Sequence, residues 1–417
     1  MHEPGHLAPG TRMSGPLDGL RVVEFASFVA GPSAGMTLAQ LGAEVIRIDP
    51  LGGGPDYRRW PVARANGESL YWNSLNRGKR SVAVDVRSEQ GRELVLALAT
   101  APGPNAGIVV DNAVGRPWFS YEALAARRAD VIKVHIGGQA GGGPAVDYTV
   151  NTEVGVTDLT GPADSRTPVN HVLPAWDLIA GMTATTALLA ALHRRQRSGD
   201  GAHLQIALAD VALAGVANLG WLSEVRERGD RPRHGNFMYG SFGADFVTAD
   251  GGRVMVVALT PRQWQALCTA TGTATVIASL EATLGVDFAD EAHRYVHRET
   301  IAAVMRPWFA ELTVDAAGAA LTAAGVLWSR YRQMSDVVAD FAAGTASGVL
   351  TELDQPGIGP VISAHSPIRE HSDYGPVGPA SALGSDTDQV FAEVLGLGDS
   401  ELAELRAAGV LGDGTRV

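Results

Sequence analysis

The chain has 417 residues, of which 46% are hydrophobic and 19% are charged. This length exceeds what one hydrophobic core usually supports, so two domains are expected, and the composition is that of a soluble enzyme rather than of a disordered chain. The net charge of −12 argues against a broad surface for nucleic acid or anionic membrane, but it is compatible with a local basic pocket for a small polyanion.

The cysteine content and the apolar runs bear on the cellular setting. A single cysteine, Cys268, excludes an intrachain disulfide and a cysteine-based zinc site, and no other metal site is predicted. Such usage is typical of a reducing cytoplasm, where we expect the protein to lie. Residues 1–14 are expected to form a flexible leader, and they lack the apolar stretch of a secretory signal. The longest apolar run, 178–192, is too short for a membrane span, and a buried helix is expected there.

The first half of the chain alternates short apolar strands with helical patterns. Strands are expected at 20–25, 44–49, 81–86, 106–110, 130–136 and 203–208, and helices at 33–42, 88–100, 120–128, 177–197 and 209–225. This alternation predicts an α/β fold with a doubly wound parallel sheet covered by helices on both faces. These elements define a large domain at residues 15–225.

A change of character follows the polar stretch 226–236. Segments 242–248 and 253–259 flank an Asp-Gly-Gly turn and predict a hairpin, and helices follow as far as about residue 330. We therefore expect a smaller α+β domain at 226–330. Residues 331–417 are expected to return to the large domain: their Pro-, Gly- and Ser-rich stretch, 357–384, would cross its surface, and helices are expected at 386–396 and 399–408.

The opening strand, glycine loop and helix invite a dinucleotide-binding hypothesis, with Asp49 at the end of the second strand. The three-glycine fingerprint is incomplete, however, because only Gly31 and Gly35 are present and Pro32 stands between them. An NAD-dependent oxidoreductase is therefore a minor alternative, and the two glycines can equally serve a tight turn and close packing.

Three blocks carry a resemblance to a known family. Residues 16–49 and 68–87, the latter with an Asn-x-x-Lys-Arg-Ser stretch, and residues 174–208, with an aspartate before a long apolar helix, resemble the class III CoA-transferases of the formyl-CoA transferase and carnitine CoA-transferase type. The resemblance implies a Rossmann-like large domain, a small domain, and a homodimer whose two chains interlock like linked rings. It also implies an acyl-CoA substrate and no permanently bound cofactor, with coenzyme A present only in the substrate and in a covalent intermediate.

A closer likeness lies in four stretches, 49–62, 169–181, 231–243 and 355–368. They resemble the members of this family that move CoA between the two carboxyl groups of one dicarboxylic acid. An intramolecular CoA transferase is therefore expected. An intermolecular transferase, and a non-catalytic acyl-CoA binding protein, stay open as alternatives.

Asp177 follows Pro174 at the start of the predicted long helix. The ordinary interpretation of such a residue is an N-cap, whose carboxylate accepts helix N–H groups. The resemblance implies that Asp177 is also the nucleophile that forms an aspartyl-CoA thioester. A carboxylate with an ordinary pKa of about 4 would be ionised at neutral pH and would need no general base.

The resemblance implies further contacts with CoA. The residues at matching positions are Phe28, Val29, Ala30, Val84, Arg87, Asn112 and Arg116. The loop 112–118 is shorter than is usual in the family, which weakens the match at Arg116. A basic cluster at 77–80 (Arg77, Lys79 and Arg80) would either face the phosphates of CoA or be solvated surface.

Other residues are candidates for the acyl group and for the oxyanion of each tetrahedral intermediate. The glycine candidates, whose N–H groups would face the oxyanion, are Gly137, Gly138, Gly240 and the run 141–143. Asn170 and His171 would line the substrate pocket, and Arg58 or Arg59 would hold a free carboxylate.

At two positions the sequence lacks a residue that other members of this family use in their reactions. Racemases of this family use a histidine directly before the aspartate that matches Asp147, and here that position is Val146, so racemisation lacks an acid–base partner. The formyl-CoA transferases carry a glutamine at the position of Val29. Both departures favour transfer between two carboxyls of one substrate.

Overall fold

The computed structural model describes residues 15–412, which form two compact units. Within the described residues, the first unit combines 15–154 with 172–222 and 347–412, and the second comprises 155–171 and 223–346. The expected small domain, 226–330, is therefore shorter than the second unit. The expected leader, 1–14, lies outside the described residues.

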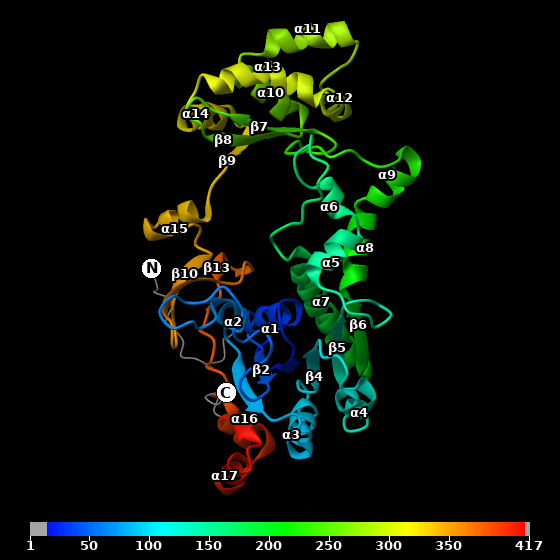
Figure 1. Cartoon of the computed structure of the whole chain (residues 1–417), viewed down its shortest axis with the longest axis vertical. Helices are drawn as coiled ribbons and strands as arrows, with labels where there is room; N and C mark the ends of the chain where they lie inside the picture. The colour runs from blue at the N-terminus through cyan, green and yellow to red at the C-terminus, as the bar shows by residue number, and fades with distance from the viewer. Residues whose placement is uncertain (1–14, 413–417) are drawn as a thin grey trace. The chain divides into compact units, whose positions relative to one another are not determined.

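A seven-stranded sheet organises the first unit (Figure 1). Its strands, in spatial order, are β14 (Leu411–Gly412), β3 (Arg80–Val84), β2 (Glu44–Asp49), β1 (Arg21–Phe25), β4 (Ile108–Asp111), β5 (Ile132–Gly137) and β6 (Ala202–Ala207). All neighbours pair in parallel except β14, which pairs antiparallel to β3. The predicted parallel α/β sheet is confirmed, and its strand order reverses between β1 and β4.

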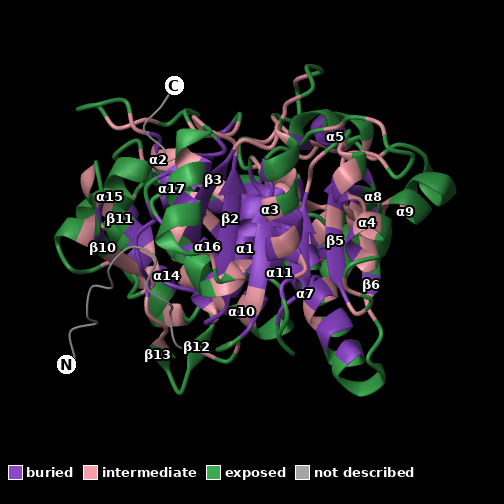
Figure 2. Cartoon of the chain, turned by 90° about the horizontal axis from the view of Figure 1, so that it is seen from below, coloured by how far each residue is buried: buried purple, intermediate pink, exposed green. Residues whose placement is uncertain are grey.

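Helices cover the strands on both faces, so the strands are buried (purple in Figure 2). The helices and the one 3₁₀ turn of the first unit up to the middle of the chain are α1 (Ala30–Gln40), α2 (Leu70–Leu75), α3 (Glu89–Ala99), η1 (Pro117–Phe119), α4 (Tyr121–Ala125), α5 (Asp147–Glu153), α7 (Ala175–Ser198) and α8 (Leu208–Asn218). The expected helix 209–225 is broken: α8 ends before Gly220, whose φ is 78°, and α9 (Trp221–Arg228) follows.

The long helix α7 packs against α1 and β5. A Cβ on Gly181 would lie 2.2 Å from Oγ of Ser33, so this glycine lets the two helices approach closely. By length and composition alone α7 could cross a membrane, and α8 with α9 could form a bent candidate span. Core helices of soluble proteins pass the same test, and 44% of the most apolar window of α7 is buried.

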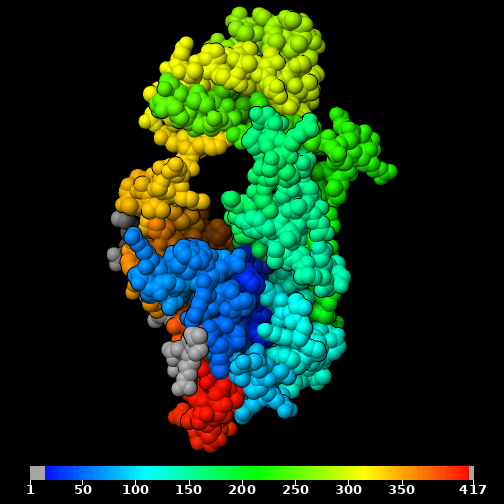
Figure 3. All heavy atoms as spheres, in the orientation of Figure 1, coloured from blue at the N-terminus to red at the C-terminus, as the bar shows by residue number. Residues whose placement is uncertain are grey.

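The C-terminal return segment completes the first unit. It comprises the hairpin β10 (Leu350–Gln355) and β11 (Gly359–Ala364), the short pair β12 (Arg369–Glu370) and β13 (Asp373–Tyr374), and the helices α16 (Thr387–Leu395) and α17 (Asp399–Ala407). The carboxylate of Asp386 accepts the Ser81 N–H at 2.7 Å, which joins this segment to β3. Figure 3 shows the resulting contact between the red C-terminal segment and the blue N-terminal part of the chain.

The second unit is an α+β body around its own core. Its predicted hairpin is confirmed as β7 (Phe242–Val247) and β8 (Arg253–Ala258), and β9 (Leu327–Arg330) adds a third antiparallel strand that the sequence did not suggest. The helices of this unit are α6 (Val156–Leu159), α10 (Pro261–Ala270), α11 (Ala274–Leu284), α12 (Glu291–Val296), α13 (Arg298–Ala310), α14 (Val314–Ala324) and α15 (Met334–Ala342). Cys268 is buried in this core.

Buried ion pairs lie behind the loop between β1 and α1. Lys79 donates to both carboxylate oxygens of Glu24, at 3.0 and 2.8 Å, and to the carbonyl of Pro32 at 2.8 Å. Arg47 forms a bidentate pair with Asp49 and also reaches Glu24 at 3.3 Å. Buried charges of this kind are tolerated only when they are paired and hydrogen-bonded, as they are here.

This network corrects the hypothesis for the basic cluster. Lys79 and Arg80 neither face phosphates nor form a solvated surface, because both are buried, and Arg80 pairs with Glu44 at 2.9 Å. Arg77 is largely buried as well and contacts Ser363. Gly35, one of the two glycines of the incomplete dinucleotide fingerprint, has a packing role. A Cβ at this position would lie 1.8 Å from Oε2 of Glu24.

Candidate active site

A cleft of about 1060 Å³ opens at the carboxyl end of the parallel sheet, where the strand order reverses. In open α/β sheets this reversal is the usual place for a ligand. The predicted site residues that line the cleft are Phe28, Val29, Ala30, Asn112, Arg116, Gly137, Gly138 and Asp177. Its volume lies just above the usual range for small-ligand pockets, as a large ligand such as CoA requires.

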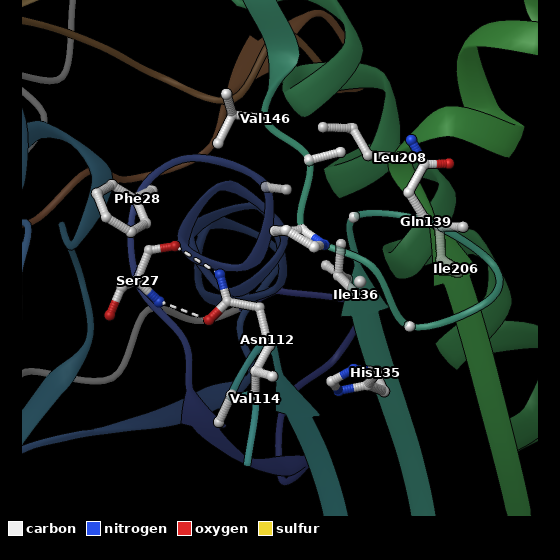
Figure 4. A pocket seen from close by; sticks show the side chains of 18 of the residues that line it. Ser27, Phe28, Asn112, Val114, His135, Ile136, Gln139, Val146, Ile206 and Leu208 are labelled. Carbon is white, nitrogen blue, oxygen red and sulfur yellow. Dashed lines mark hydrogen bonds between the residues drawn. The ribbon is translucent and has the colours of Figure 1, made fainter. Parts of the chain in front are cut away.

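The loop after β1 presents Phe28 to the cleft (Figure 4). Phe28 has a φ of 68°, which L-residues rarely adopt, and its side chain is 41% exposed. Its N–H donates to the Asp56 carboxylate at 2.8 Å, and Asp56 in turn accepts from Arg47. The buried ion pairs therefore hold the strained backbone that exposes this aromatic ring.

Asn112 holds the same loop from the neighbouring strand. Its side-chain amide donates to the Ser27 carbonyl at 2.8 Å, and its carbonyl oxygen accepts the Ser27 N–H at 3.0 Å (Figure 4). Asn112 was expected to contact CoA, and this pair of bonds gives it a second role in positioning the loop between β1 and α1.

Two basic side chains, Arg116 and His135, also line the cleft. The Arg116 guanidinium lies 3.9 Å from the centroid of the Phe25 ring, and burial lowers the pKa of Arg116. His135 lines the cleft as well, with its Nδ1 at 2.9 Å from the Asp111 carboxylate. The sequence reasoning missed His135, although its position just before the Gly137–Gly138 pair was a usable signal.

Asp177 is the third residue of α7, and it does not cap that helix. The cap is provided by Asp147, whose Oδ2 accepts the backbone N–H of Trp176 at 2.8 Å and that of Asp177 at 3.3 Å. The prediction of an N-cap role for Asp177 is therefore wrong. A second bond, from the Trp176 indole to Asn151 at 3.0 Å, also joins α5 to the start of α7.

The expectation of an ordinary pKa for Asp177 is wrong too. Partial burial and the nearby Asp147 charge raise the pKa of Asp177 to about 6, while Arg59 acts in the opposite direction. A carboxylate with a raised pKa is a stronger nucleophile than an ordinary one and is still mostly ionised at neutral pH. Asp177 is thus a partly buried carboxylate whose pKa is raised but still lies below neutral pH.

Several predicted residues do not line this cleft. Val84 is fully buried in β3, and the exposed Arg87 pairs with Asp85 at 3.0 Å. Asn170, His171 and Gly240 belong to the second unit. Arg58 is exposed, and it is the adjacent Arg59 that interacts with Asp177. Of the glycine run 141–143, the last two residues line the cleft.

The chain belongs to CoA-transferase family III, whose model matches residues 17–387. Among curated relatives it is 45% identical to a 2-methylfumaryl-CoA isomerase of Chloroflexus aurantiacus, over 96% of this chain and 98% of that protein. It is 29% identical to a succinyl-CoA–D-citramalate CoA-transferase of the same species, over 95% of this chain and 98% of that protein. A crystal structure of a CaiB/BaiF family protein from Brucella suis matches 91% of this chain and 99% of its own, with a TM-score of 0.74 and 28% identity.

Family membership makes the chain a CoA-transferase acting on CoA thioesters, and it replaces the oxidoreductase hypothesis. The class III resemblance seen in the sequence is confirmed. The mostly parallel α/β sheet agrees with the matching CaiB/BaiF structure.

Proposed function

We propose that the chain moves CoA between the C1 and C4 carboxyl groups of mesaconyl-CoA (2-methylfumaryl-CoA) within one substrate molecule. The observation that carries this proposal is the 45% identity to a 2-methylfumaryl-CoA isomerase over 96% of the chain. The absence of a histidine at Val146 and of a glutamine at Val29 agrees with it. We place the reaction in the 3-hydroxypropionate cycle and in the cytoplasm.

In the proposed mechanism Asp177 is the nucleophile. Its carboxylate attacks the thioester carbonyl, which gives a mixed anhydride and releases CoA thiolate. The thiolate then attacks the aspartyl carbonyl of the anhydride, so that the C1 carboxylate leaves and an aspartyl-CoA thioester remains. Free energy of the thioester bond is conserved at each exchange.

The second half repeats these steps from the other end of the acid. The C4 carboxylate attacks the aspartyl thioester and expels the thiolate, and the thiolate attacks the C4 carbonyl of the new anhydride to regenerate Asp177. Each addition creates an oxyanion, for which the proposed donors are the N–H groups of Gly137 and Gly138. Phe28, Val29, Ala30 and Arg116 are the proposed contacts to CoA.

Asp147 is expected to set the pH dependence. In an Asp147→Asn variant the amide oxygen can still accept the N–H groups of α7, but the charge that raises the pKa of Asp177 is gone. The pKa of Asp177 should fall below about 6, so the acidic limb of kcat/KM should move to lower pH by roughly one unit. A profile between pH 4.5 and 8 measures this shift.

The matched control is Glu153→Gln, which removes one charge from the exposed end of the same helix, where Glu153 accepts from Gln139 at 2.8 Å. Its acidic limb should stay in place. An equal shift of the acidic limb in both variants, or no shift in either, would contradict the role proposed for Asp147.

Isotope exchange tests the proposed function. The enzyme is given mesaconyl-C1-CoA together with a tenfold excess of carbon-13-labelled free mesaconate, and the products are followed by liquid chromatography and mass spectrometry. We expect mesaconyl-C4-CoA to form without label. Label entering at the rate of product formation would instead identify the intermolecular transferase, the activity in the name of the D-citramalate relative.

We also propose that two chains form the interlocked homodimer implied by the resemblance. Two helices support this proposal, because α9 and α15 bury none of their residues while they expose large apolar side chains. The exposed residues are Leu222, Val225, Met334, Val337 and Val338. Unpartnered apolar helix faces of this kind mark association surfaces.

A further inference from the structure

Arg59 is held in a defined position beside the nucleophile. Its guanidinium carbon lies 5.5 Å from the centroid of the Phe28 ring and 5.5 Å from that of the Tyr71 ring. Its backbone is fixed on both sides, since its N–H donates to the Asp56 carbonyl at 3.1 Å and its carbonyl accepts from the Ser69 hydroxyl at 2.5 Å. Two aromatic faces thus orient a side chain that would otherwise move freely.

The guanidinium of Arg59 takes part in no salt bridge with the described residues. Between residues 15 and 412, no carboxylate lies within ion-pair distance of its guanidinium, whereas Arg47 and Lys79 are both fully paired. Arg59 is exposed, and it is close enough to Asp177 to lower the pKa of that carboxyl. A cation without a carboxylate partner among the described residues therefore lies against the ring of Phe28, which lines the cleft together with Asp177.

A dicarboxylic substrate needs such a cation. While one carboxyl is bound to CoA, the other is ionised and is repelled by Asp177 and by Asp147 behind it. The planar guanidinium can bind a carboxylate through two parallel hydrogen bonds and can offset this repulsion. Tyr71 stays a neutral neighbour, because burial raises its pKa to about 12.

We propose that Arg59 binds the free carboxylate of the dicarboxylyl-CoA substrate beside Asp177, and that it serves the C4 and the C1 carboxylate in turn as CoA moves from one to the other. This inference rests on the proposed function. Of the two arginines expected from the sequence to hold the free carboxylate, Arg58 and Arg59, it selects Arg59.

The test compares Arg59→Gln and Arg59→Lys with the control Arg58→Gln, which removes the neighbouring exposed cation. The substrate is mesaconyl-C1-CoA, and methacrylyl-CoA, which lacks the second carboxylate, is used as a competitive inhibitor. Arg59→Gln should raise the KM of mesaconyl-C1-CoA by about 10- to 100-fold, as loss of a charge-assisted pair predicts. The inhibition constant of methacrylyl-CoA should change less than about threefold, and Arg59→Lys should restore part of the loss.

An equal weakening of both CoA esters by Arg59→Gln would overturn the proposal, because it would show a merely structural role. An unchanged KM, or an equal effect of Arg58→Gln, would overturn it too. A failure of the proposed function looks different: the unsubstituted enzyme would then form no mesaconyl-C4-CoA without label.

Discussion

Replacing Asp177 by asparagine is expected to reduce CoA transfer roughly 10³-fold or more while leaving the fold intact. The amide has no anionic oxygen with which to open the thioester, and no other described carboxylate lines the cleft apart from Asp49, which is paired with Arg47. The fold should survive because the start of α7 is capped by Asp147 and not by Asp177. Steady-state rates and circular dichroism measure the two effects.

Intact-mass analysis gives a second readout for the same variant. After incubation with mesaconyl-C1-CoA and rapid acid quench, the unsubstituted enzyme should carry an adduct of CoA less one water, and Asp177→Asn should carry none. The matched control is Asp210→Asn, because Asp210 is likewise the third residue of its helix, α8. Full activity in Asp177→Asn, or an equal loss in Asp210→Asn, would remove Asp177 from the proposed mechanism.

Replacing Lys79 by methionine is expected to cost about 3–5 kcal/mol of folding free energy. The Glu24 carboxylate is completely buried, and without Lys79 it keeps only the longer contact with Arg47 at 3.3 Å. The Pro32 carbonyl loses its bond from Lys79 as well. Urea unfolding followed by tryptophan fluorescence measures this change in the free energy of unfolding.

The control for this variant is Arg127→Met. Arg127 forms a well-aligned pair with Glu93, at 2.6 and 2.7 Å, but both side chains are exposed to solvent. Exposed pairs contribute at most about 1 kcal/mol, so this variant should be nearly as stable as the original. Equal losses in the two variants would contradict the importance given to burial.

The central sheet could be predicted from the sequence because its strands carry their signal locally. The run at 44–49 contains Val45, Ile46 and Ile48, follows a helix, and is β2 with the same bounds. The strand β14 could not be found, since two residues without a pattern become a strand only by pairing with β3. The break between α8 and α9 was similarly hidden within one apolar stretch.

The site was predictable only in part, because its charged residues pair with residues that are far away in the sequence. Lys79 and Arg80 look like surface charges until β1 and β2 bring Glu24 and Glu44 to them. The cap of α7 comes from Asp147, a residue of another helix, and no spacing rule links it to Asp177. The choice of Arg59 over Arg58 needed the rings of Phe28 and Tyr71.

The start of α7 depends on α5, because the backbone N–H of Trp176 donates to Asp147 and its indole N–H donates to Asn151. A redesign that transplants α7 alone into another scaffold would carry the proposed nucleophile but leave its neighbouring N–H groups without their acceptor. The smallest transferable module is therefore α5 together with the first turn of α7. Directed evolution of new acyl specificities would accordingly do best to vary the loop 139–145, which lines the cleft, and to keep both helix ends unchanged.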